Sequence, residues 1–315
     1  MEYAPVLVAL GVLFLSALAL DAFGRRTHIP RVTLLILLGA VLGPPALDVL
    51  PPALSGTNDS YAAVALTMVA FLLGGSLGRK TLAKHGRTIL LLSLAVVTVS
   101  ILAMAVGLIA VGVPAELALI LAGISAATAP AATRDVIHQS GQTGPFATMI
   151  LGVVAIDDVW GILVFSVLLT ISGTLIGASA ESALLHGVYE AGGAVALGLG
   201  VGIPAAYLTG RLKPGEPTLL EALGVVLLCA GFALALKVSF LITGITCGAV
   251  IVNLARHHDQ PFHEIEQIEW PFILLFFVMA GASLEIESLR QIGVIGLAYI
   301  VLRFVARVVG GVVGG

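Results

Sequence analysis

Charge is scarce in this chain of 315 residues. Only 10% of the residues are Asp, Glu, Lys or Arg, whereas soluble domains carry about 25%. The net charge is −3, and no basic cluster exceeds a few positions, so nothing indicates nucleic-acid binding. Cysteine is also rare. Cys229 and Cys247 both lie in apolar runs, which indicates neither a disulfide framework nor a metal site.

Long apolar runs take the place of the missing charge, and 59% of the residues are hydrophobic. A membrane β-barrel would instead show alternating segments of about ten residues. We predict an all-α polytopic membrane protein with about eleven transmembrane helices, placed by apolar runs and charged breaks. The predicted spans are 4–22, 30–50, 61–78, 88–112, 115–134, 146–173, 187–209, 219–236, 239–255, 270–284 and 292–315.

Lys and Arg are distributed unevenly between the two sets of alternating loops. Positively charged loops stay in the cytoplasm, so the richer set is predicted to be cytoplasmic and the N-terminus outside. The poorer set holds only Lys237 and Arg290. The richer set holds Arg25, Arg26, Arg31, Arg79, Lys80, Lys84, Arg87, Arg134, Arg211, Lys213 and Arg256.

The two ends of the chain lead to further predictions. Glu2 precedes the first apolar run and Arg25 and Arg26 follow it. This order is the reverse of a signal peptide's, so the run is predicted to be a retained helix. Short loops favour the inner membrane of a prokaryotic cell. The chain stops at GGVVGG, still in an apolar span, and we expect a fragment that is truncated at its C-terminus.

Two adjacent carboxylates, Asp157 and Asp158, lie near the middle of the apolar run 146–173. Each costs about 2.5–3.5 kcal/mol at that depth on insertion scales. Neighbouring residues on a helix point about 100° apart, so one carboxylate can engage a fixed cation while the other faces a cavity. The pair predicts an ion or proton path, in which a buried carboxylate trades a proton for a cation.

The preceding span contains the run SAATAPAAT at 125–133. Pro130 lacks an N–H and pushes Ala129 toward an extended backbone. A helix broken at this depth frees carbonyls that can line an ion site, and Thr128 adds a hydroxyl oxygen suited to a monovalent cation. The alternative is a plain proline kink packed with small residues.

Two arginines, Arg303 and Arg307, lie four residues apart in the last span and therefore share a helix face. One interpretation makes them interfacial anchors whose long side chains snorkel to the membrane surface. The other makes Arg307 the counter-ion of a buried aspartate, which offsets part of the burial cost on both sides.

These motifs together resemble the cation–proton antiporter superfamily, the sodium/hydrogen exchangers. The specific part is SAATAPAATRDVI followed by GVVAIDDVWGIL, which resemble the unwound crossing helix and the helix with the ion-site carboxylates. Weaker similarities are IPRVTLLILLGAVLGP, ALTMVAFLLGGSLGRKTL, PFILLFFVMAGASLEIESL and LRFVARVVGG.

The resemblance implies an inverted-repeat fold with a discontinuous crossing helix, in which 1–315 forms one transporter unit. A mobile core would comprise about 61–173 and 292–315, and a dimerisation scaffold about 4–50 and 187–284, which implies a homodimer. The resemblance also places Asp158 as the principal cation and proton ligand, Thr128 at the break, and Asp157 as the partner of Arg307.

The chain departs from the family pattern in two ways. Arg307 replaces a lysine and Ala306 a glycine. Arginine cannot give up its proton as a buried lysine can. The Asp–Asp pair resembles the electrogenic branch of the family, whereas the arginine argues against membership of that branch. The ratio of protons to cations therefore stays open. The family also continues with a second broken helix and one more span, which agrees with truncation.

We therefore predict a secondary antiporter, not an enzyme, that exchanges protons for Na⁺ or K⁺ by alternating access. It would need no cofactor and no metal beyond the transported monovalent cation at Asp158. The alternatives are a sodium-coupled symporter of the same fold and, less favoured, an ion channel. An intramembrane aspartyl protease needs two aspartates that face each other from separate helices, which Asp157 and Asp158 cannot provide.

Overall fold

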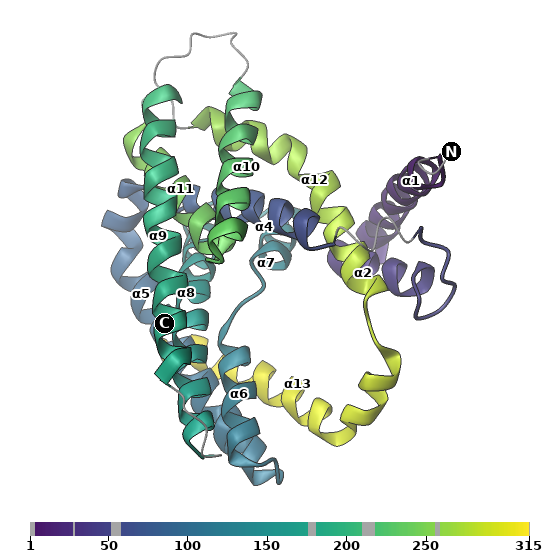
Figure 1. Ribbon diagram of the computed structural model, residues 1–315, viewed down its shortest axis with the longest axis vertical. Helices are drawn as coiled ribbons and strands as arrows, with labels where there is room; N and C mark the ends of the chain where they lie inside the picture. Colours follow the sequence, from purple (N-terminus) through teal and green to yellow (C-terminus); the bar gives the residue numbers. More distant parts are fainter. Residues whose placement is uncertain are drawn as a thin grey trace.

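A computed structural model describes residues 4–27, 29–51, 58–175, 181–209, 218–255 and 259–314. Arg211, Lys213, Arg256 and Gly315, which entered the predictions above, lie outside these ranges. The described residues form helices and connecting turns without strands (Figure 1). The helices are α1 (Ala4–Thr27), α2 (Arg31–Leu42), α4 (Asn58–Gly75), α5 (Arg79–Ala110), α6 (Ala115–Ala126), α7 (Pro130–Gln139), α8 (Pro145–Leu175), α9 (Glu181–Thr209), α10 (Thr218–Leu236), α11 (Phe240–Leu254), α12 (Asp259–Ala282) and α13 (Ile286–Gly314).

The prediction of an all-helical, multi-pass membrane protein is confirmed. Seven of the described helices are long and apolar enough to cross a membrane, or eight if α6 and α7 together count as one bent span. The apolar helices α2, α4 and α11 are shorter than the roughly 20 residues that a perpendicular crossing requires. The count of about eleven spans therefore stays a prediction.

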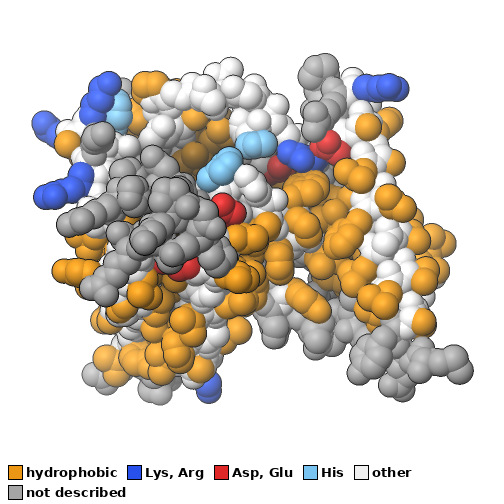
Figure 2. All heavy atoms as spheres, turned by 90° about the horizontal axis from the view of Figure 1, so that it is seen from above, with side chains coloured by type: hydrophobic (Ala, Val, Ile, Leu, Met, Phe, Trp, Pro, Cys, Tyr) orange, Lys and Arg blue, Asp and Glu red, His pale blue; other side chains and the backbone are white. Residues whose placement is uncertain are grey.

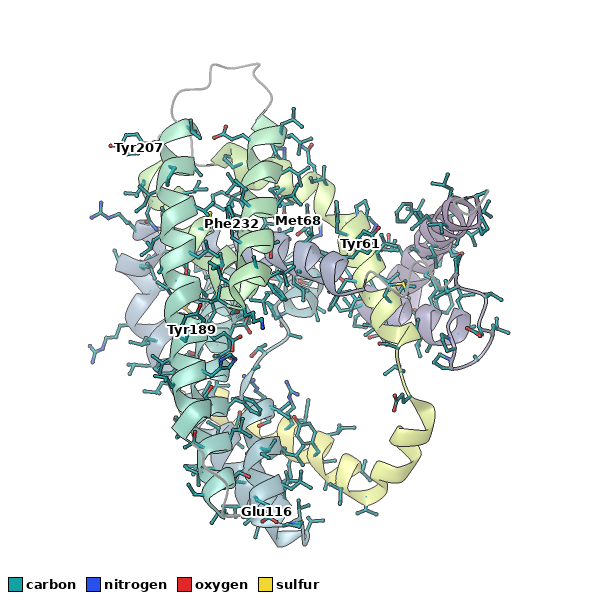
Figure 3. All side chains as sticks on the ribbon, viewed as in Figure 1. Tyr61, Met68, Glu116, Tyr189, Tyr207 and Phe232 are labelled. Atoms are coloured by element: carbon teal, nitrogen blue, oxygen red, sulfur yellow. The ribbon has the colours of Figure 1, made fainter. Side chains whose placement is uncertain are left out.

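Large apolar side chains cover much of the outside of the molecule. Tyr207 and Phe304 are 72% and 71% exposed, and Figure 3 shows Tyr207 pointing away from α9. Met68 and Phe71 of α4 are instead fully buried between helices. An apolar exterior of this extent suits a helix bundle whose solvent is lipid.

Glycines allow two pairs of helices to pack with their backbones in contact. A methyl group added at Gly74 of α4 would overlap the carbonyl oxygen of Ile245 on α11, and one added at Gly248 of α11 would overlap that of Phe71 on α4. Gly39 of α2 lies equally close to the backbone of α12. Close backbone packing through small residues is the usual way in which membrane helices associate.

The predicted crossing span 115–134 is two helices. α6 ends at Ala126 and α7 begins at Pro130, with a bend of 40° between them. In Figure 1, α6 lies low in the view and α7 above it, and α13 crosses the lower part. α13 packs against α5, and α8 packs against α5, α6 and α9. The break therefore lies near α8, which carries the paired aspartates.

We expect Gly74→Ala to lower the melting temperature in detergent, because its methyl group would collide with the α11 backbone. Overpacking of this kind costs about 1–3 kcal/mol. Gly231→Ala on α10 is the matched control, because the added methyl group meets no described atom within 4 Å outside the adjoining backbone of its own helix. Equal melting temperatures for the two variants would show that α4 and α11 can separate without cost.

Candidate functional site

The chain is extended where α6 gives way to α7. Ala127 has φ −70° and ψ 145°, and Ala129 has φ −82° and ψ 99°. Pro130 occupies the first turn of α7, where its missing N–H leaves no helical bond unmade. The helix break therefore contains Thr128 and lies directly before Pro130. The last carbonyls of α6 have no partner within their own helix and must find one elsewhere.

Asp157 is fully engaged by hydrogen bonds from α5, from the helix break and from α13. Ser93 of α5 donates to Oδ1 at 2.7 Å, and Thr128 donates to Oδ2 at 2.6 Å. Nη1 of Arg307 on α13 also donates to Oδ2 at 2.9 Å, as an ion pair. The Asp157 side chain is 1% exposed. Its charge is thus balanced and both of its oxygens are occupied.

Arg307 also closes the open end of α6. Its Nη2 donates to the carbonyl oxygens of Ser125, Ala126 and Ala127 at 3.2, 2.6 and 2.9 Å. A cation at a helix C-terminus is further favoured by the helix dipole. The break was expected to free carbonyls for a transported ion, but these three accept hydrogen bonds from arginine.

Arg303 joins Arg307 at the break. Its Nη2 donates to the Ala127 carbonyl at 2.8 Å, and its Nη1 lies 3.4 Å from the Tyr299 hydroxyl. The sequence indicated the shared helix face of the two arginines but not this contact. Ser93 was not singled out at all, because one serine in an apolar helix is not a specific pattern.

Asp158 points in a different direction from its neighbour. It is 7% exposed, and its Oδ2 has no hydrogen-bond partner among the described residues. It lines a cavity of about 290 Å³. The other lining residues come from α6, the helix break, α8 and the start of α11, and they are Gly123, Ile124, Ala127, Gly161, Ile162, Phe165, Ser239 and Leu241.

The cavity has the chemistry of a simple ion site. Among the described residues that line it, Asp158 is the one carboxylate, and Ser239 adds a hydroxyl to a lining that is otherwise mainly apolar. In the described part of the chain, no group of three or more His, Cys, Asp or Glu side chains is placed to hold a metal ion. A lone buried carboxylate can bind a proton or one monovalent cation.

We expect Arg307→Ala to destabilise the protein, because Asp157 would keep its charge without a partner. Removing one member of a buried ion pair costs about 3–5 kcal/mol, which a melting curve in detergent would detect. Adding Asp157→Asn to the same variant should recover part of the loss, since no charge is then stranded. Equal melting temperatures for wild type and Arg307→Ala would contradict the pairing.

Comparisons with known proteins identify the family of this chain. A family described as sodium/hydrogen exchanger, transmembrane, matches residues 10–315. The chain is 25% identical to the ammonium/H⁺ antiporter subunit AmhT of Alkalihalophilus pseudofirmus, across 99% of this chain and 79% of AmhT.

Two solved structures share the fold, and both are of the sodium proton antiporter MjNhaP1 from Methanocaldococcus jannaschii. One, determined at pH 8, has a TM-score of 0.73 at 22% identity, and the other, from electron microscopy, 0.77 at 20%. Each covers all of this chain and 79% of MjNhaP1. Since the family match spans nearly the whole sequence, this chain belongs to the sodium/hydrogen exchanger family of secondary transporters, which are not enzymes.

Proposed function

We propose that this protein exchanges protons for monovalent cations, Na⁺ or K⁺, and that Asp158 carries each of them in turn. The observation that supports this most directly is the contrast between the neighbouring carboxylates. Asp157 is bonded at both oxygens, while Asp158 is buried, has an oxygen without a partner and faces a cavity. AmhT and MjNhaP1, named as ammonium and sodium antiporters with protons, also handle monovalent cations.

The exchange follows from the cost of burying a charge. An ionised Asp158 in a mainly apolar cavity is costly without a partner. A cation neutralises it, and so does a proton, so binding one releases the other. Thr128 donates its hydrogen to Asp157 and is not among the described residues that line the Asp158 cavity, so its role as an ion ligand stays a prediction. Because each state is neutral, the site can move or reorient across the membrane by alternating access.

The mainly apolar lining also bears on the symporter alternative. An organic substrate needs several convergent polar groups. Of the described residues that line this cavity, Asp158 and Ser239 alone have polar side chains. A channel would need a continuous polar path, which this cavity does not supply. Antiport of small cations requires only the one exchangeable carboxylate.

The architecture that we propose follows the family resemblance. The core would hold about 61–173 and 292–315, with inverted repeats, and the scaffold about 4–50 and 187–284. The scaffold would form a homodimer in the cell membrane. The Lys and Arg distribution supports an outside N-terminus, with α7 ending toward the cytoplasm.

We expect Asp158→Asn to abolish cation-dependent collapse of a pH gradient in proteoliposomes, because the amide cannot exchange a proton for a cation. Na⁺, K⁺ and ammonium should each be supplied to wild type to identify the cation. Asp48→Asn is the matched control, since Asp48 is exposed and Asn tolerates its positive φ of 48°. Full activity of Asp158→Asn would defeat the assignment.

We further expect electroneutral exchange, with one proton per monovalent cation. Asp158 offers one negative charge, and Arg307 remains protonated against Asp157. The ion gradient at which net flux stops should therefore not shift when a membrane potential of about 100 mV is imposed. One uncompensated charge would add roughly 2.3 kcal/mol and shift that gradient about fiftyfold. A shift of that size would show that a second group titrates.

A further inference from the structure

A second group of charged side chains lies on the other side of the helix break from the Asp158 cavity. We call it the α7 cluster. Figure 2 shows acidic, basic and histidine side chains gathered in a hollow on the face seen there. The exchange site described above uses none of the cluster's residues. They are Asp21 of α1, Arg31 of α2, Arg134 and Asp135 of α7, and Glu266 and Glu269 of α12.

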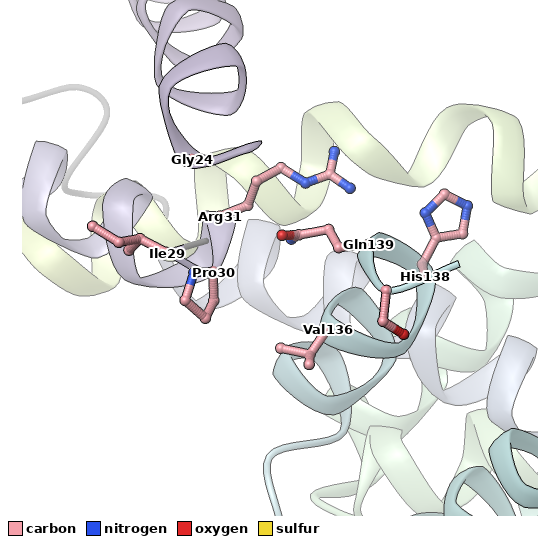
Figure 4. A pocket seen from close by; sticks show the side chains of 8 residues that line it. Gly24, Ile29, Pro30, Arg31, Val136, His138 and Gln139 are labelled. Atoms are coloured by element: carbon pink, nitrogen blue, oxygen red, sulfur yellow. The ribbon is translucent and has the colours of Figure 1, made fainter. Parts of the chain in front are cut away.

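Arg31 connects α2 to three other helices. Its Nε lies 3.2 Å from Oδ1 of Asp21, and its Nη2 lies 3.2 Å from Oδ1 of Asp135. Its guanidinium also lies 4.3 Å from the ring centre of Trp270 on α12. Figure 4 shows Arg31 and Gln139 reaching toward the same space from α2 and α7, and Gln139 donates to Asp135 at 2.5 Å.

Arg134 connects α7 to α12 in the same way. Its Nη1 pairs with Glu269, and its Nη2 lies 3.2 Å from Oε1 of Glu266. The Arg134 and Glu269 side chains are 15% and 12% exposed. Largely buried charges of this kind are costly when they lose their partners, so the pairs hold α7 against α12.

The contact is polar and incompletely filled. A cavity of about 90 Å³ lies among these side chains, and Arg31, Arg134, Glu269, Trp270 and Ala131 line it. A larger cavity, about 630 Å³, adjoins it, because Arg31 and His138 line both. When charged side chains separate, water can take the place of their partners. Water cannot replace the close backbone packing of α4 against α11 in this way.

The two sides of the break therefore differ. The described residues that line the Asp158 cavity belong to α6, the helix break, α8 and the start of α11, and none of them belongs to α7. The cluster lies between α7, α2 and α12, next to the larger cavity. The distribution of Lys and Arg predicts that α7 and the cluster lie on the cytoplasmic side of the membrane.

We propose that the α7 cluster is a gate that closes the cytoplasmic path to Asp158. Its ion pairs hold α7 against α2 and α12, and they must separate before Asp158 can exchange its ion on that side. α7 is the right element for this, because it begins directly after the break that contains Thr128. The inference rests on the transport function proposed above.

The test measures exposure of Ala131, which is 4% exposed and lines the smaller cavity. An Ala131→Cys chain in inside-out vesicles is treated with a membrane-impermeant thiol reagent. Cys229 and Cys247 are buried, and labelling of the chain without Ala131→Cys is subtracted. Adding Arg134→Gln should speed labelling about tenfold, as a loss of roughly 1.4 kcal/mol from the closed state would.

Two further variants make the result specific. Arg87→Gln is the control, because Arg87 is an exposed basic residue on α5 outside the cluster, and labelling should not change. The charge swap of Arg134→Glu with Glu269→Arg should restore slow labelling, since the pair is re-formed with opposite polarity. Labelling that stays fast in the charge swap would argue against a pair-dependent gate.

Unchanged labelling in Arg134→Gln would overturn the gate, even if the melting temperature falls, because the pairs would then serve stability alone. If Arg134→Gln does not fold, Glu269→Gln replaces it, because it also removes the Arg134–Glu269 pair while keeping the size of the side chain. The labelling rate of Ala131→Cys is then read in the same way. Labelling does not require transport. Absence of cation-dependent pH changes in wild-type proteoliposomes would thus sink the proposed function, while labelling alone decides whether the cluster opens.

Discussion

The ion pair between Asp157 and Arg307 organises the centre of this molecule. It joins α8 to α13, and the same guanidinium caps the open carbonyls of α6. Thr128 and Ser93 complete the hydrogen bonds of the carboxylate. A buried charge pair is stable only when its remaining donors and acceptors are also satisfied. Here that requirement brings α5, the helix break, α8 and α13 to one point.

The hydrogen bonds that hold Asp157 leave Asp158 without a fixed partner at its Oδ2 among the described residues. Successive residues on a helix diverge by about 100°, so Asp157 and Asp158 cannot face the same partner. Asp157 points into the arginine contacts and Asp158 into a cavity between α6, α8 and α11. In the function that we propose, the pair combines a fixed structural charge at Asp157 with an exchangeable one at Asp158.

The helices are held together by two contrasting kinds of contact. Glycine backbones bring α2 against α12 and α4 against α11, with no room even for a methyl group. α7 meets α2 and α12 through charged side chains around a small cavity. Close backbone packing resists sliding, whereas ion pairs can exchange partners with water. The broken helix therefore connects the ion pairs of α7 to the cavity at Asp158, which α6 helps to line.

The sequence by itself determined the membrane class, the helix break before Pro130 and the presence of two buried carboxylates. These depend on local chemistry, namely apolar length, a missing N–H and the cost of charge in lipid. The residues at the centre of the site, Asp157 and Arg307, were also identified, although their pairing was inferred only from a resemblance.

Only the tertiary structure decided what each group contacts. Asp157 and Arg307 are 150 residues apart, and Arg303 and Ala127 are 176 apart. No local pattern predicted that arginines would occupy the carbonyls of the break, that Ser93 would meet Asp157, or that α7 would pair with α2 and α12. Such contacts depend on how distant helices pack and rotate, and a helix's own sequence fixes its faces but not the partner that each face meets.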